Sequence, residues 1–213
     1  MAVTLSVDAV TAHLDTLVPP RHAELQRMEA WAAEHDFPII GPASGHCCYL
    51  LARIAKAQRV FELGSGYGYS TAWFARAVRE NGGGEVHHAV WDEELSRRAR
   101  AHLAALGLDD LVRYHVGEAV AALRADGGTY DLIFNDIDKA GYPASIAAIE
   151  RHLRPGGLLI MDNMIWSGRA LDSADQSADT VGIREATRLL TSSPHWISTI
   201  VPIRDGLMVA SRV

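Results

Sequence analysis

The chain has 213 residues, of which 48% are hydrophobic and 22% charged, and its formal net charge is −6. This length suffices for one domain with a full core and is short for two. No run of about 18 apolar residues occurs, and the first thirty residues lack a basic stretch followed by an apolar one, so we expect a cytoplasmic protein without membrane contact. The only two cysteines, Cys47 and Cys48, are neighbours, which excludes a disulfide framework and a cysteine-based zinc site. The acidic balance offers no overall attraction to nucleic acid.

The hydrophobic pattern changes character near residue 58 of the chain. The first part predicts three helices, at 9–18, 24–35 and 45–57. After it, short apolar or β-branched runs at 59–63, 85–91, 112–116, 130–135 and 157–161 alternate with helical or loop segments, including helices at 70–80, 93–106 and 180–190. This alternation predicts an α/β fold with a parallel sheet covered on both faces. Two last strands, 196–202 and 206–212, read as a closing hairpin. We expect a single domain over 1–213, with a helical segment at 1–57 and an α/β core at 58–213.

A glycine-rich turn follows the first predicted strand and opens the next helix. Gly64, Gly66 and Gly68 leave the backbone open to a ligand at the carboxyl end of the strand. The dinucleotide fingerprint requires glycine at position 69, where this chain has Tyr69, which disfavours a nicotinamide cofactor. Glu62, just before the turn, would repel a pyrophosphate but not an ammonium group or sugar hydroxyls. Taken alone, the turn also suits a tight structural connection.

Polar side chains end two further predicted strands. Asp136 and Asp138 follow the fourth strand, and Asp162 and Asn163 follow the fifth. Because adjacent parallel strands bring their carboxyl ends together, Asp136, Asp162 and Asn163 would present three hard oxygen ligands, suited to Mg²⁺ or Ca²⁺. Asp138 and Asp162 serve equally well to begin loops or cap helices, which is common for aspartate at strand ends.

Lysine is rare in this chain. Only two of the twenty basic residues are lysines, Lys56 and Lys139, and the other eighteen are arginines. Arginine stays protonated, whereas a lysine near a cation or in a dry pocket can lose its proton and act as a base. Lys139 lies among carboxylates and Lys56 at an ordinary helix end. A general preference for arginine over lysine explains the low number of lysines equally well, as long as the positions of the two lysines are not considered.

Two sequence patterns resemble a known enzyme family. Glu62-x-Gly64-x-Gly66-x-Gly68 resembles motif I of the class I S-adenosylmethionine-dependent methyltransferases, and the turn at 68–71 is similar to that of the caffeoyl-CoA and catechol O-methyltransferase group. D-x-D-K-x-x-Y at 136–142 and D-N-x-x-W-x-G at 162–168 resemble the metal-binding signature of the cation-dependent O-methyltransferases, bacterial branch. The resemblance covers about residues 38–211. It implies a Rossmann-like class I methyltransferase fold, with a seven-stranded, mostly parallel sheet, a C-terminal antiparallel hairpin and added N-terminal helices.

The resemblance also implies roles for residues at the predicted metal site. A divalent cation, Mg²⁺ first with Ca²⁺ or Mn²⁺ as alternatives, would be held by Asp136, Asp162 and Asn163. Lys139 would take the proton from the acceptor hydroxyl. This role favours the position of Lys139, rather than a general preference for arginine, as the reason for a lysine there. The candidates to line the acceptor pocket are Tyr142 and Trp166, although either suits an aromatic core position equally well.

S-adenosylmethionine is the cofactor that the resemblance implies. Its expected contacts are Ile40, Glu62, Gly64, Ser65, Gly66, Gly68, Ser70, Glu118 and Ala119, with Asp136 also nearby. The family's ribose-binding acid falls on Val90, which cannot accept a hydroxyl proton. Asp92, two residues on, would share a strand face with it if the strand reaches that far. We therefore expect Asp92 or a water molecule to replace the missing acid.

The function predicted first is methyl transfer to a hydroxyl of a small catechol-like or polyhydroxylated aromatic, by a homodimer. An alternative is a tRNA hydroxyuridine O-methyltransferase, because the segments 28–39 and 201–206 are similar to that bacterial branch too. RNA binding would require arginines gathered at the rim of the site. The candidates for that rim are Arg169, Arg184, Arg188 and Arg204. A third possibility, from another class, is a non-catalytic nucleotide-binding module or a nicotinamide oxidoreductase.

Overall fold

The computed structural model describes residues 6–213, so the first five residues of the expected helical segment lie outside the described part. Its centre is a seven-stranded sheet in the order β3-β2-β1-β4-β5-β7-β6. The strands are β1 (Arg59–Leu63), β2 (Glu85–Val90), β3 (Val112–Val116), β4 (Tyr130–Asn135), β5 (Leu153–Met161), β6 (Trp196–Val201) and β7 (Leu207–Arg212). Strands β1 to β5 pair in parallel, whereas β7 runs antiparallel to both β5 and β6. The predicted mostly parallel sheet with a C-terminal hairpin is confirmed.

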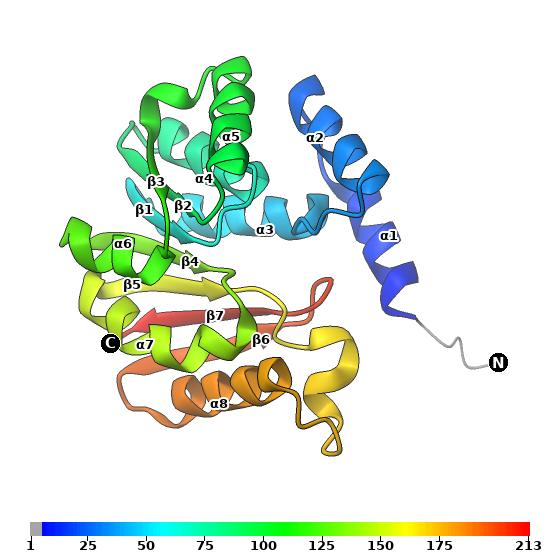
Figure 1. Cartoon of the computed structure of the whole chain (residues 1–213), viewed down its shortest axis with the longest axis vertical. Coiled ribbons are helices and arrows are strands. Elements are labelled where there is room, and N and C mark those ends of the chain that lie inside the picture. The colour runs from blue at the N-terminus through cyan, green and yellow to red at the C-terminus, as the bar shows by residue number, and fades with distance from the viewer. Residues whose placement is uncertain (1–5) are drawn as a thin grey trace.

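Helices cover both faces of this sheet (Figure 1). They are α1 (Val7–Leu17), α2 (Ala23–Glu34), α3 (Gly41–Ile54), α4 (Tyr69–Glu80), α5 (Glu93–Ala105), α6 (Ala119–Asp126), α7 (Tyr142–His152) and α8 (Ala178–Ser192), with short 3₁₀ turns at Asp109–Leu111, Lys139–Gly141 and Trp166–Leu171. One apolar cluster joins α2 to α5 with one face of the sheet, and a second joins α6 to α8 with the other. Val60 belongs to the first and Phe61 to the second, because successive strand side chains point to opposite faces.

Helices α1 and α2 lie at the periphery of the molecule, away from the strands (Figure 1). Helix α1 has no buried residue, whereas α2 buries Leu25 and Met28 in the first apolar cluster. The hydroxyl of Tyr67, in the turn, donates to the backbone oxygen of Met28 at 2.9 Å. Helix α2 therefore holds the turn from outside. In the described chain, no helix is both long and apolar enough to cross a bilayer.

Candidate active site

A pocket of about 620 Å³ opens at the carboxyl edge of the sheet, next to the ends of β1, β2, β4 and β5. This edge is where open α/β sheets bind ligands. Among the predicted site residues, those that line the pocket are Ile40, Gly64, Ser65, Gly66, Ser70, Asp92, Glu118, Ala119, Asp136, Lys139, Asp162, Asn163 and Trp166. Three others, Glu62, Gly68 and Tyr142, do not reach its surface.

The glycine-rich turn is fixed by the neighbouring strand. The backbone nitrogens of Gly64 and Ser65 both donate to the carbonyl of Ala89, at 3.1 and 3.0 Å, and the nitrogen of Ala89 donates to Ser65 Oγ at 3.0 Å. A Cβ on Gly64 would collide with the backbone of Asp136, and one on Gly68 would lie 2.9 Å from Ala99 Cβ of α5. These two glycines are therefore required by packing within the protein, which corrects the expectation that Gly68 faces a ligand.

Glu62 lies beneath the turn and is fully buried. Thr71 donates a hydrogen bond to its Oε2, while its Oε1 has no partner among the described residues. Burial raises the pKa of Glu62 from 4.5 to about 7, although the nearby hydroxyl groups of Ser70, Thr71 and Ser65 oppose the rise. A cation above the turn would favour the charged form of this carboxyl group. Its contact with a cofactor would accordingly be electrostatic and would act through the turn.

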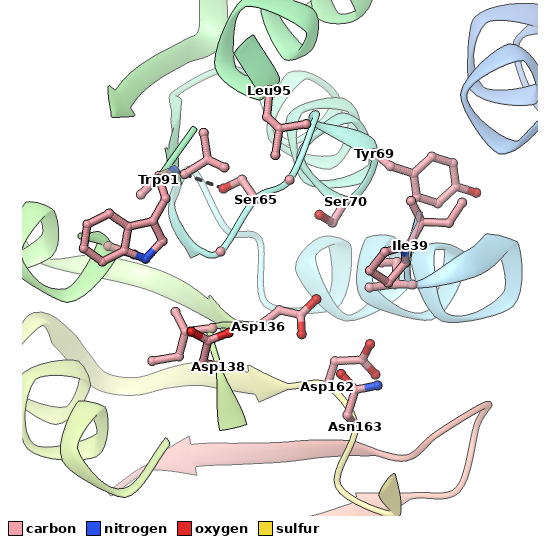
Figure 2. Close-up of a pocket in the computed structure, with 18 of the residues that line it drawn as sticks. Ile39, Ser65, Tyr69, Ser70, Trp91, Leu95, Asp136, Asp138, Asp162 and Asn163 are labelled. Atoms are coloured by element: carbon pink, nitrogen blue, oxygen red, sulfur yellow. Dashed lines mark hydrogen bonds between the residues drawn. The ribbon is translucent and has the colours of Figure 1, made fainter. Parts of the chain in front are cut away.

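Carboxylates from two strand ends meet on the opposite side of the pocket. Asn135 pairs with Met161 across β4 and β5, so the next residues, Asp136 and Asp162, leave the sheet side by side. Figure 2 shows Asp136, Asp162 and Asn163 extending toward one pocket. The structure thus brings together the three oxygen donors predicted from the sequence.

Each of these two carboxylates already faces a basic side chain. Lys139 Nζ lies 2.5 Å from Asp136 Oδ1 and also donates to the carbonyl of Ile137 at 3.2 Å. Arg204 Nη1 lies 3.2 Å from Asp162 Oδ2. Burial and the nearby charge of Asp136 raise the pKa of Asp162 to about 7, against the opposing effect of Arg204. Burial likewise raises the pKa of Asp136, while Lys139 opposes the rise.

Tyr142 does not line the pocket, contrary to expectation. Its side chain is completely buried, and its hydroxyl oxygen lies 3.2 Å from the carbonyl of Asn135 and 3.0 Å from that of Asp162. It ties together the two strand ends that carry the carboxylates. Tyr142 is thus a positioning residue, whereas Trp166 does lie on the pocket wall.

The cofactor side differs from expectation at the end of β2. The strand stops at Val90, so alternation along it does not place Asp92. Asp92 is instead the N-cap of α5, where its Oδ1 accepts from the nitrogen of Leu95 at 2.8 Å. It still lines the pocket, and its second oxygen is not used by the cap. Glu118 caps α6 in the same way, with both carboxylate oxygens accepting backbone N–H groups.

Sequence reasoning missed several residues that line the pocket. Trp91 is 70% exposed and stands at one end of it, across the Ser65 turn from Tyr69 and Ile39 (Figure 2). Its position directly after Val90, at the carboxyl end of the predicted strand, was the only indication in the sequence. Arg204 was considered only as an RNA-binding residue. The remaining lining residues not foreseen include Phe37, Pro38, Leu95, Ile137, Gly141 and Asp179.

The other arginines of the proposed RNA-binding rim have protein partners. Arg169 pairs with Asp175, and Arg188 pairs with Glu185 one helical turn away. Arg184 donates to backbone carbonyls of the loop that precedes α8. None of these three lines the pocket.

Comparison with known proteins assigns the family. A family model described as O-methyltransferase matches residues 19–213. The chain belongs to the O-methyltransferase family. It is 34% identical over 207 residues to a Mycobacterium sp. (strain JLS) protein that is provisionally named an O-methyltransferase, covering 96% of this chain and 93% of that relative. The predicted family and enzyme class are confirmed, and the oxidoreductase alternative is disfavoured.

Solved O-methyltransferases share the whole fold. An O-methyltransferase from Bacillus cereus, solved with SAH, superposes with a TM-score of 0.88 at 26% identity, covering 98% of this chain and all of that one. TomG from Streptomyces achromogenes, an O-methyltransferase of tomaymycin synthesis solved with SAM, gives a TM-score of 0.85 at 25% identity and covers 96% of each chain. The Rossmann-like methyltransferase fold is therefore confirmed over nearly the full length.

Proposed function

We propose that this O-methyltransferase transfers the methyl group of S-adenosylmethionine to a hydroxyl of a small aromatic with neighbouring hydroxyls, assisted by a divalent cation. One observation carries the proposal: a single pocket joins the glycine-rich turn after β1 to Asp136, Lys139, Asp162 and Asn163 after β4 and β5. Its volume of about 620 Å³ lies within the range of small-molecule sites. The two structural neighbours described above were solved with SAH and SAM, which supports the choice of methyl donor.

The methyl donor would lie along the turn between α4 and the end of β2. Helix α4 begins without a capping side chain, so the N–H groups of its first turn are free to receive a carboxylate. Ser65, Ser70 and Ile40 border that position. Trp91 would offer a flat apolar surface for the adenine, and the free oxygen of Asp92 would accept a hydrogen bond from a ribose hydroxyl.

The residues after β4 and β5 fit a divalent cation. Asp162 Oδ1 is buried without a partner among the described residues. The amide nitrogen of Asn163 donates to Asp205 Oδ2 at 2.9 Å, which leaves its oxygen available. Within residues 6–213 no group of three His, Cys, Asp or Glu side chains is placed to hold a metal, so the proposed site depends on Asn163 as its third ligand. Two carboxylates and an amide favour Mg²⁺, with Mn²⁺ or Ca²⁺ as alternatives.

The chain's own groups would prepare the acceptor for methyl transfer. A phenolic hydroxyl has a pKa near 10 in water, and a bound cation supplies charge that stabilises its oxyanion. Lys139 lies beside Asp136 and the carbonyl of Ile137, and a bound cation would favour the neutral form of its amine by like-charge repulsion. After releasing its own proton to solvent, that amine would accept the proton of the acceptor hydroxyl. Trp166 borders the acceptor, and the strand ends fix its orientation toward the methyl donor. Such alignment contributes on the order of 7–11 kcal/mol in well-oriented reactions.

A labelled methyl donor tests this function directly. The purified protein is incubated with it, Mg²⁺ and a panel of catechols, flavonoids and undermodified tRNA, with excess chelator in a parallel series. We expect label in a catechol-type acceptor and its loss in chelator. Equal labelling with and without chelator would refute the requirement for a divalent cation, and labelling of tRNA alone would favour the tRNA methyltransferase alternative. The homodimer and the cytoplasmic location stay predictions from the sequence; light scattering measures the first.

A further inference from the structure

Arg204 occupies an unusual backbone position at the edge of the pocket. It lies in the turn between β6 and β7 with a φ of +50°. Residues other than glycine, asparagine and aspartate seldom adopt this left-handed backbone region. Gly206, two residues on, also has a positive φ. A bulky side chain is retained in strained backbone where surrounding contacts or function hold it. The contact that this conformation gives Arg204 is the ion pair with Asp162.

That ion pair lies at the proposed cation site. The Asp162 side chain is only 2% exposed and the Arg204 side chain 30%, so water screens the pair weakly. The guanidinium lies against Asp162 Oδ2, whereas Oδ1 has no partner among the described residues. Lys139 stands in the same relation to Asp136. Without a cation, each of the two carboxylates therefore has a basic side chain of the chain itself as its counter-ion.

A cation bound between Asp136 and Asp162 would repel the guanidinium. A doubly charged ion within a few ångströms of Arg204 meets a like charge in a partly dry pocket. The arginine stays protonated at any working pH, so it cannot relieve this repulsion by losing a proton. The Arg204 side chain is 30% exposed, so it can turn toward solvent.

We propose that Arg204 is an internal counter-ion of Asp162 that competes with the divalent cation and leaves Asp162 when the cation binds. The proposal rests on the proposed function, because it requires the cation site. It assigns Arg204 the role of setting cation affinity: a cation must displace one ion pair before it gains the carboxylate. The cost of that displacement weakens cation binding, while the pair keeps Asp162 from being a buried, uncompensated charge in the cation-free enzyme.

Direct binding of Mn²⁺ tests the proposal without measuring turnover. Free Mn²⁺ is followed by its electron paramagnetic resonance signal in titrations of the wild type, Arg204→Gly, Arg204→Lys and the control Arg188→Ala. Glycine suits the positive φ, so Arg204→Gly should fold, which circular dichroism verifies. We expect Arg204→Gly to bind Mn²⁺ more tightly by on the order of tenfold, or about 1.4 kcal/mol. Arg204→Lys keeps the charge and should stay nearer the wild type, and Arg188→Ala should match it.

The outcomes separate the two proposals. Wild-type binding with equal or weaker binding by Arg204→Gly overturns the role of Arg204 and leaves the cation site standing. Absence of Mn²⁺ binding in every protein overturns the cation site and the role of Arg204 with it. A second measurement is the rise in unfolding temperature on adding Mn²⁺, which should be larger for Arg204→Gly than for the wild type, since tighter binding to the folded state stabilises it more.

Discussion

Replacing Glu62 with glutamine should change how the stability of the cofactor-free protein depends on pH. Glu62 is completely buried, and its pKa rises from 4.5 to about 7, chiefly because burial disfavours its charged form. The unfolded chain loses the proton near pH 4.5, whereas the folded protein keeps it until about pH 7. Between these values the folded state binds the extra proton, so stability falls as the pH rises. The stabilising contribution of Glu62 is complete below its pKa in the unfolded chain and is lost as the pH rises above its pKa in the folded protein.

The size of the effect follows from the two pKa values. One pKa unit corresponds to about 1.36 kcal/mol, so between pH 5 and pH 8 Glu62 should lower the free energy of unfolding by on the order of 2–3 kcal/mol. Glutamine is uncharged at every pH and removes this loss. Asp136 and Asp162 also have raised pKa values, but they are present in both proteins. The difference between wild type and Glu62→Gln therefore isolates most of the contribution of Glu62.

Urea unfolding at a series of pH values measures this difference. We expect the stability of Glu62→Gln relative to wild type to rise steadily from pH 5 to pH 8. Glu80→Gln is a control of opposite sign, because hydrogen bonds from Tyr49 and Arg76 outweigh burial and lower the pKa of Glu80. Its ionised form stabilises the fold, and that stability is lost as the pH falls. A wild-type minus Glu62→Gln difference that stays constant with pH would refute the reasoning.

Three further predictions concern the site. Lys139→Met should lower kcat by about 10²–10⁴-fold, the usual contribution of a general base, while calorimetry finds cofactor affinity nearly unchanged; a proportional loss of both would contradict the role of Lys139. Asp92→Ala should weaken cofactor binding and also cost about 1 kcal/mol of stability through the lost helix cap. Asp92→Asn keeps the cap and serves as the control for stability. Unchanged cofactor affinity in both variants would remove Asp92 from the ribose site. Asp162→Ala should abolish methyl transfer together with Mn²⁺ binding, and retained metal-dependent activity would place the cation elsewhere.

Most of the fold was predictable because its strands are defined by local pattern. The predicted ranges for β1, β3 and β4 coincide with the observed strands. Prediction failed where long-range contacts set a boundary. The fifth strand was predicted to begin at Gly157, yet β5 begins at Leu153, which pairs with Tyr130 before a register shift. Helix α3 starts at Gly41, earlier than predicted, and the carboxylate of Asp15 in α1 accepts a hydrogen bond from the nitrogen of Ala43 in its first turn. No local pattern contains either contact.

The same distinction explains the candidate site. Asp136 and Asp162 were predictable because each directly follows a recognisable strand, and parallel pairing then places the two side by side. Tyr142 was misplaced because the sequence pattern that contains it does not show which way its ring points. The ring turns inward, since its hydroxyl meets the carbonyls at the ends of both strands.

Arg204 shows what sequence reasoning about charge leaves out. Arg204 was named only among the arginines that RNA binding would require, but the role of a basic side chain depends on which acidic group it contacts. The antiparallel pairing of β7 with β5 brings the turn at Arg204 beside the end of β5, and the guanidinium meets Asp162 there. An arginine that neutralises a buried aspartate is not available to a phosphate at the same time. Arg204 already lines the pocket, and if the cation displaces it from Asp162 its charge is unpaired only in the metal-bound enzyme, where it contributes to the electrostatic field that an acceptor meets.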